Sequence, residues 1–276
     1  MRTTSRRSII PGFSLTLGLT FGYLSVLVIL PLAALVIHGS AQGLDPFIAL
    51  LTSPRVQSAL TLSLGTALAA ALINLFIGLV VAWTLVRYRF PGRPLLDALI
   101  DLPFALPTAV AGISLTTLCA PQGALGKLAA NFGISLAFTP LGIILALVFV
   151  TFPFVVRTVQ PVLEDLNPEL EEAAATLGAG NLRTFVDVLL PALWPALLTG
   201  FTMAFARALG EYGSIVFISG NMPLRTEVLP LLIMNRLEQF DHAGASALAL
   251  IMLIISFVLL LVGNILQTRL VRTRVL

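Results

Sequence analysis

Residues that could hold a metal ion or form a disulfide are scarce in this sequence. Its 276 residues include one cysteine, Cys119, and two histidines, His38 and His242. These are too few soft ligands for a zinc site, an iron–sulfur cluster or a disulfide. The HExxH and GxSxG patterns of hydrolytic enzymes are also absent. We therefore expect no catalytic residue, no bound cofactor and no metal site in this chain.

Lysine and charge are equally scarce. Lys127 is the only lysine, and a Walker A loop around it would need a glycine and a hydroxyl residue where the sequence has Pro121 and Leu128. The sequence therefore predicts that the chain does not bind ATP through that motif. Charged residues make up 11% of the chain and hydrophobic ones 58%, against roughly 25% and 45–50% in soluble proteins. This composition predicts a protein of the lipid bilayer.

Six apolar segments are each about as long as the ~20 residues that a membrane-spanning helix needs, or longer. They are Phe13–Ile37, Gln57–Val86, Leu99–Leu118, Thr139–Gln160, Leu189–Ser219 and Ala243–Gln267. We expect an all-α integral membrane protein in which residues 1–276 form a single transmembrane domain. Six spans would place both termini on the same side of the membrane.

The basic residues indicate how these spans are oriented. With a cytoplasmic N-terminus, the inner segments would hold Arg2, Arg6, Arg7, Arg87, Arg89, Arg93, Arg157, Arg183, Arg269, Arg272 and Arg274, and the outer loops Arg55, Lys127, Arg225 and Arg236. Eleven basic residues inside against four outside satisfies the positive-inside rule. We expect cytoplasmic termini in a bacterial-type inner membrane, and no binding of nucleic acid, because the arginines lie at span ends and not on one face.

The first apolar segment allows two interpretations. Ser5-Arg6-Arg7-Ser8 resembles the start of a secretory signal, and Gly39-Ser40-Ala41 could be a cleavage site. An apolar stretch of about 25 residues, however, exceeds the 7–15 residues of a signal peptide. We therefore expect this segment to be retained as the first span.

A polar stretch between the fourth and fifth spans predicts a short cytoplasmic helix at about 168–178. Asn167 suits the N-cap, Pro168 the first helical position, and the acids that follow suit the positive end of the helix dipole. We expect the helix to stop at Gly178 or Gly180, which gives about 15 Å, too short to cross a membrane.

This short helix could serve as a docking surface or as a passive connector. Three successive alanines, Ala173–Ala175, leave a low profile that lets another protein approach the backbone. A connector lying on lipid headgroups would instead be expected to have a basic face, and this helix is acidic. The residues alone leave both interpretations open and favour docking.

Glu172-Ala173-Ala174, then Gly178 and later Leu190-Pro191, resemble the "EAA…G…LP" signature of binding-protein-dependent ABC importer permeases. The signature lies before the last two spans, as it does in that family of type I importers. The resemblance implies that Glu169–Leu177 is a coupling helix that docks on an ATP-hydrolysing subunit. The residues it assigns to coupling are Glu169, Glu172, Ala173, Ala174, Leu177, Gly178 and Pro191.

Other stretches resemble the T-type permease subunits of sulfate/thiosulfate importers. They include Pro11-Gly12-Phe13, Ser219-Gly220-Asn221-Met222-Pro223, Leu237-Glu238-Gln239-Phe240 and Ala243-Gly244-Ala245. The runs from Pro103 to Gly112 and from Arg207 to Gly213 also resemble molybdate permeases, so a molybdate or tungstate permease remains an alternative. The resemblance implies as partners a homologous W-type permease, two ABC ATPase subunits that bind ATP and magnesium, and a periplasmic sulfate-binding protein.

Two broken spans are our candidates for the wall of an anion passage. Arg207 and Glu211 are charges within the fifth segment, four residues apart and so on one helical face. They could form a structural pair, Arg207 could bind backbone carbonyls freed at the nearby glycines, or Arg207 could line the passage. At 31 residues this segment would measure about 46 Å as one helix, so we expect it to bend or break among Pro191, Pro195, Gly200, Gly210 and Gly213. The same expectation applies to the third segment at Pro103 and Pro107, and Thr108 beside them is a further candidate for the passage.

Two further groups of charges have open interpretations. Asp101 and Asp97 stand at the end of the third segment, where a paired or solvated end charge is favoured over a proton relay. The outer loop from Gly220 to His242 is rich in charge and could contact a binding protein or simply be solvated. The rival class, an ATP-independent anion transporter, would more often show several intramembrane ionisable groups and an internal repeat.

Overall fold

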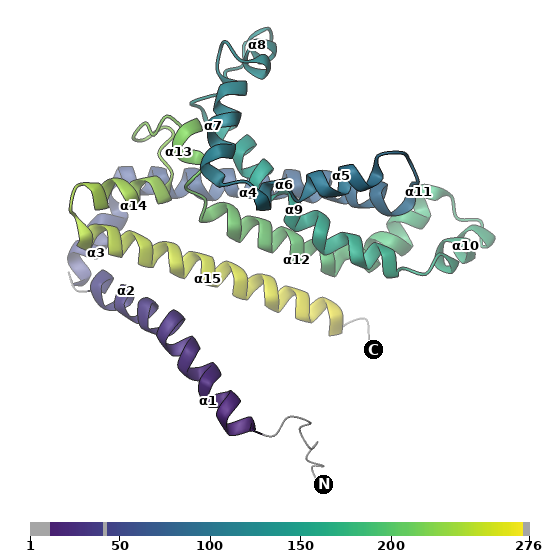
Figure 1. The fold of residues 1–276 in the computed structure, drawn as a ribbon, viewed down its shortest axis with the longest axis horizontal. Coiled ribbons are helices and arrows are strands. Elements are labelled where there is room, and N and C mark those ends of the chain that lie inside the picture. Colours follow the sequence, from purple (N-terminus) through teal and green to yellow (C-terminus); the bar gives the residue numbers. More distant parts are fainter. Residues whose placement is uncertain (1–11, 41–42, 273–276) are drawn as a thin grey trace.

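The computed structural model describes residues 12–40 and 43–272, and every regular element in these ranges is a helix (Figure 1). Several sequence predictions lie outside them: Arg2, Arg6, Arg7 and Arg274 of the basic-residue count, the Ser5–Ser8 motif, Pro11 and Ala41.

Five helical runs of the described chain are long and apolar enough to cross a membrane. The first comprises α1 (Phe13–Leu24), the π-helical turn η1 (Ser25–Ile29) and α2 (Leu30–Ser40), and the second is α4 (Pro54–Arg87). The others are α9 (Pro140–Asp165), the run α11 (Asn181–Thr184), η2 (Phe185–Leu189) and α12 (Leu190–Leu209), and finally α15 (His242–Arg272). Each overlaps one predicted span. Four of them, α4, α9, α12 and α15, run side by side as a bundle (Figure 1).

The third predicted span, Leu99–Leu118, is not one continuous helix, as its prolines led us to expect. It is divided into α5 (Arg93–Ile100), α6 (Leu102–Ala105) and α7 (Thr108–Cys119). Two prolines explain the division. Pro103 falls in the first turn of α6, and Leu106 before Pro107 takes an extended conformation, as residues before proline tend to. The predicted break at these prolines is confirmed.

The fifth predicted span also breaks, at one of the places expected. Helix α12 ends at Leu209, and Gly210–Ser214 forms a turn that leads into α13 (Ile215–Ile218). The helix continues through Pro195 and Gly200, so a break at either of these two residues was wrong. Leu189–Ser219 is therefore a long helix followed by a turn and a single helical turn.

Close contacts at small residues hold the bundle together. A methyl group added to Gly78 of α4 would lie 2.8 Å from Val155 Cγ1, and one added to Gly200 of α12 would lie 3.0 Å from Val155 Cα. Val155 of α9 is therefore held between two glycines on different helices. Buried Asn74 adds a polar contact, donating to the Thr151 hydroxyl at 2.9 Å and the Val148 carbonyl at 3.0 Å. Close van der Waals packing and such hydrogen bonds, worth about 0.6 kcal/mol each, associate helices in lipid.

The bundle has two distinct ends (Figure 1). One, which we call the α10 end, carries α5, α11 and the short helix α10 (Glu169–Thr176). The opposite α14 end carries α3 (Leu44–Thr52) and α14 (Leu229–Glu238), while α7 and α8 (Ala124–Ala130) project from the side of the bundle. The first helical run meets α15 where Gly39 packs against Ser246 and Leu250, and most of its other described side chains are exposed.

The charged residues of the predicted outer loop are not all solvated. Nearly half of that loop is the helix α14, which packs on α15 and α4. Glu227 is buried and receives two hydrogen bonds from the Arg55 guanidinium, both 2.7 Å long. Full solvation was therefore wrong for Glu227, because a distant arginine neutralises it inside the fold.

Candidate functional site

The polar segment after α9 forms the short helix that the sequence predicts. Helix α10 begins after Asn167-Pro168, and the Asn167 side-chain oxygen accepts a hydrogen bond from the Glu169 backbone N–H at 3.1 Å. The Asn167 carbonyl accepts from Leu170, and the Pro168 carbonyl from Glu171 and Glu172. The first turn therefore combines a side-chain cap, a proline and three acids, which is the pattern that starts helices.

Gly178 ends the helix, as one of the two predicted stops. Its φ is +81°, in the left-handed region, and the Ala179 N–H turns back to the Ala174 carbonyl at 3.0 Å. This is the hydrogen bond of a glycine-terminated helix. A side chain at position 178 would meet no atom within 4 Å, so the glycine is required by the backbone and not by space.

A cluster of α4 and η2 side chains fastens this helix to the bundle. The Arg87 guanidinium, in the last turn of α4, forms an ion pair with Glu171. It also lies over the Trp83 ring, 5.5 Å from the ring centroid. Trp83 in turn packs edge to face on Phe185, with ring centroids 5.6 Å apart. Arg87 thus connects α10 to the end of a membrane-spanning helix.

The other side of α10 faces outward. Ala174 is buried, whereas Glu169, Glu172 and Ala173 are exposed. Leu177 is 88% exposed, and Leu182 in the neighbouring α11 is 78% exposed. The exposed members of the predicted coupling set therefore form a small surface in which Leu177 stands with carboxylates, and Leu182 adds a second exposed leucine. Pro191 lies apart from it, in the first turn of α12 directly after η2.

The charged pair of the fifth segment is formed, and it supports the break in that segment. Arg207 donates to Glu211 Oε2 at 2.7 Å, and the Glu211 side chain is only 1% exposed. The other oxygen, Oε1, accepts from the Ser214 backbone N–H at 2.9 Å and the Ser214 hydroxyl at 3.1 Å. Glu211 is therefore bound on both oxygens within the turn. The Arg207 side chain, by contrast, is 37% exposed.

The two broken segments lie against each other. A methyl group added to Gly213 would fall 2.2 Å from Thr108 Oγ1, and one added to Gly112 would fall 2.5 Å from the Ser214 carbonyl oxygen. The structure therefore brings Thr108, at the start of α7, onto the turn that Glu211 stabilises. Pro103 is buried and Pro107 exposed. Whether these residues line a passage stays a prediction.

Sequence reasoning missed the residues that hold the site in place. Arg87 was counted only as an orienting charge, and Trp83 was not singled out. The available signal was their spacing, because residues four apart on a helix share a face, and here that face lies at the end of an apolar span. The partners Glu171 and Phe185 are more than eighty residues away, so the sequence alone could not supply them.

Comparisons with known proteins place this arrangement in context. Residues 74–275 match the family described as "Binding-protein-dependent transport system inner membrane component". The chain is 51% identical over 250 residues to the "Probable sulfate transport system permease protein cysT" of Nephroselmis olivacea, covering 91% of this chain and 88% of that protein. It is 48% identical over 269 residues to the "Sulfate transport system permease protein CysT" of Salmonella typhimurium, covering 98% and 97%.

Two solved structures share the fold. A bacterial ABC transporter involved in the import of the acidic polysaccharide alginate matches with a TM-score of 0.76 at 16% identity, over 92% of this chain and 94% of that chain. The methionine ABC transporter MetNI, in an inward-facing conformation, matches with a TM-score of 0.61 at 18% identity, over 83% and 99%. At these identities the similarity concerns the fold alone, and it confirms the predicted all-α importer permease fold.

Proposed function

Because the chain belongs to the family of binding-protein-dependent transport system inner membrane components, we propose that it is a permease subunit that carries sulfate or thiosulfate into the cytoplasm. Near-half identity to sulfate permeases over almost the full length supports the anion. A dianion cannot enter hydrocarbon, because even one charge at the bilayer centre costs several kcal/mol. A polar passage that opens to one side at a time would remove that cost.

The observation that carries the coupling part of the proposal is the exposed surface of α10. A leucine that is 88% exposed, at the end of an acidic helix too short to cross the bilayer, suits a contact with another protein. In the proposed mechanism this surface docks on an ABC ATPase subunit, which binds ATP and magnesium. Arg87 then passes the movement of α10 to α4, and this chain performs no chemistry itself.

The proposed orientation places the α10 end in the cytoplasm of a bacterial inner membrane. Arg87, Arg89, Arg93 and Arg183 belong to this end, and basic residues favour the cytoplasmic side. With the broken segment α5–α7 as a sixth crossing, both termini would be cytoplasmic. The α14 end would then face a periplasmic sulfate-binding protein, and a W-type homologue would complete the membrane dimer.

The test is transport by the assembled complex in proteoliposomes. This chain is reconstituted with its candidate ATPase, W-type partner and binding protein, and sulfate-stimulated ATP hydrolysis and uptake are measured. We expect Gly178→Val to abolish the stimulation, because a β-branched residue is strained at φ +81°. Gly180→Val is the matched control, since Gly180 has an extended backbone (φ −75°, ψ 163°) and open space around it.

Three results would contradict parts of the proposal. Equal loss of stimulation in both valine variants would remove the assigned role of α10. Stimulation by molybdate but not by sulfate would show that the transported anion is molybdate and not sulfate. Sulfate uptake by this chain without any ATPase would contradict an ATP-driven importer altogether.

A further inference from the structure

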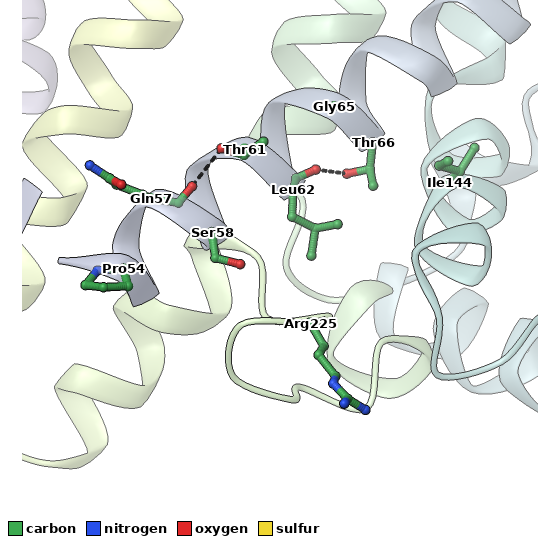
Figure 2. Close-up of a pocket in the computed structure, with 9 residues that line it drawn as sticks. All are labelled: Pro54, Gln57, Ser58, Thr61, Leu62, Gly65, Thr66, Ile144 and Arg225. Carbon is green, nitrogen blue, oxygen red and sulfur yellow. Dashed lines mark hydrogen bonds between the residues drawn. The ribbon is translucent and has the colours of Figure 1, made fainter. Parts of the chain in front are cut away.

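An open pocket of about 590 Å³ lies at the α14 end, between the first turns of α4, the start of α9 and the loop 220–228 (Figure 2). Gln57, Ser58, Thr61 and Thr66 of α4 line one side, with Ile144 of α9 and Arg225 of the loop on the others. The lining holds one full positive charge and no carboxylate. In composition it is suited to an anion.

The α4 side of this pocket differs from the rest of the same helix surface. Gln57, Thr61 and Gly65 are exposed, whereas the exposed residues further along α4 are apolar, beginning with Leu68 and Leu72. Apolar side chains can face lipid, but polar side chains within a membrane span usually face protein or a water-filled cavity. The change of character at Gly65 therefore marks how far a water-filled space reaches along α4.

Arg225 stands out among the arginines of this end. Arg55 holds Glu227, and Arg236 holds Asp241. In residues 12–40 and 43–272, no side-chain hydrogen bond or ion pair is formed by Arg225, by Ser58 or by the amide of Gln57. These three side chains keep their donors available to a ligand. The Thr61 and Thr66 hydroxyls, by contrast, donate to backbone carbonyls of α4, as Figure 2 shows.

The loop that carries Arg225 is fixed on both sides of it. Asn221 and Leu224 have positive φ values of 46° and 64°, conformations that persist in non-glycine residues only where surrounding contacts enforce them. The Met222 N–H donates to the Thr226 hydroxyl at 3.0 Å, and the Met222 carbonyl accepts from Thr226 at 2.9 Å. Glu227, next in the chain, is buried under Arg55. The loop therefore holds the Arg225 backbone in one position.

From this geometry we propose that the pocket around Arg225 is the first binding site in the permease for a tetrahedral oxyanion. The inference rests on the proposed function, because it assumes that the anion arrives at the α14 end. The guanidinium supplies a charge and a planar set of donors, which suits an oxyanion edge. Ser58 supplies a neutral donor, and the exposed polar residues Gln57 and Thr61 of α4 lead the anion toward Gly65.

The first test uses thiol labelling of the full chain in membranes, which does not depend on transport. In a Cys119→Ala background, Ser58→Cys places the only thiol in the pocket. We expect an anionic methanethiosulfonate reagent to modify Cys at position 58 several times faster than a cationic one. Sulfate should slow this reaction, and chloride at equal ionic strength should not. Gln239→Cys, exposed at the end of α14 and outside the pocket, is the control and should show neither effect.

Arg225 variants decide whether the arginine causes these effects. Arg225→Gln should remove the preference for the anionic reagent and the protection by sulfate, and Arg225→Lys should keep the preference. Unchanged preference and protection in Arg225→Gln would overturn the proposal, as would equal protection by chloride and sulfate.

The second test separates this site from a docking contact with the binding protein. In the assembled importer, Arg225→Gln should lower maximal sulfate uptake about tenfold, the effect of losing one charge-assisted hydrogen bond. The binding-protein concentration for half-maximal ATPase stimulation should stay unchanged. A raised half-maximal concentration with full maximal uptake would overturn the proposal and make Arg225 a docking residue. Failure of the wild type to import sulfate would contradict the proposed function, while the labelling results would still decide on the site.

Discussion

The Arg87 guanidinium on α4 and the Glu171 carboxylate on α10 form an ion pair between segments 84 residues apart in the sequence. The pair is only partly exposed, with side-chain exposures of 20% and 34%. It lies between the helix that carries the exposed leucine and the helix that crosses the membrane.

Reversing one charge of this pair should weaken coupling, and reversing both should restore it. We expect Arg87→Glu and Glu171→Arg each to lower ATP-dependent uptake in proteoliposomes, with most of the activity regained in the double variant. A thermal-unfolding double-mutant cycle should give an interaction of about 0.5–1 kcal/mol, typical of partly exposed pairs. The matched control is Arg183–Asp187, an exposed ion pair in which the arginine also precedes the acidic residue. Charge reversal there should change both uptake and unfolding temperature little.

The close packing at Gly78 predicts that alanine substitution will affect stability differently at Gly78 and at Gly65, although both lie in α4. Gly78→Ala should destabilise the chain by about 1–3 kcal/mol, because its methyl group would press on the Val155 side chain. Gly65→Ala should be neutral or slightly stabilising, because its methyl group meets no atom within 4 Å and alanine favours helix. Thermal unfolding in detergent measures both. Equal effects of the two substitutions would contradict the packing described for Val155.

Asp241 predicts an effect of pH on stability. Its carboxylate accepts from Arg236 and from the Gly244 N–H, the latter at 2.9 Å, at the start of α15. The hydrogen bond from Arg236, followed by that from Gly244, lowers the pKa of Asp241 below its usual 3.8. A lowered folded-state pKa stabilises the fold above the unfolded pKa, and this stabilisation is lost as the pH falls through the folded value.

Two substitutions at Asp241 separate charge from capping. Asp241→Asn should keep the helix cap and lose the contribution of this group to the decline of stability below about pH 4. Asp241→Ala should lose the cap as well, at a cost of about 1 kcal/mol near neutral pH. Unfolding temperatures between pH 3 and pH 7 measure both. If Asp241→Asn loses as much stability below pH 4 as the wild type does, the lowered pKa of Asp241 contributes nothing to the pH dependence of stability.

Asp101 and Asp97 should differ in importance although both bind Arg157. Asp101 accepts from Arg157 Nε and Nη2 at 2.8 and 2.7 Å, whereas the Asp97 carboxylate accepts only from Nη1. The Asp97 backbone carbonyl would keep its own bond to Arg157 after a side-chain change. We expect Asp101→Ala to lower the free energy of unfolding by about 1 kcal/mol, and Asp97→Ala by less. The reverse order in chemical denaturation would contradict this.

The sequence allowed prediction of the features that local chemistry determines. Asn167, Pro168 and Gly178 specify the start and end of α10 without help from the rest of the chain. Gly210 similarly marks the break after α12. The apolar runs predicted five of the spans. Backbone N–H and C=O groups in a bilayer core must be hydrogen-bonded within the protein, and a long helix provides those hydrogen bonds.

Features that depend on distant partners could not be predicted in this way. Glu227 looked like a solvated loop charge because Arg55, which neutralises it, is 172 residues away. Helix α14 was hidden for a related reason, since its buried Leu231 and Leu232 acquire neighbours only when α4 and α15 are in place. Arg225 could be recognised as an arginine without a carboxylate partner among the described residues only once the other arginines of that end had been assigned theirs.

Val155, held between Gly78 and Gly200, has a mechanical consequence. At the level of this valine, α4, α9 and α12 have no room for a methyl group between them, so sliding one helix past another would require the side chains to separate. The three helices would therefore tilt together as one rigid body. A displacement of α10 would then be transmitted along α12 to Gly210 at its far end. The turn that Glu211 stabilises would be the nearest point at which the chain could bend.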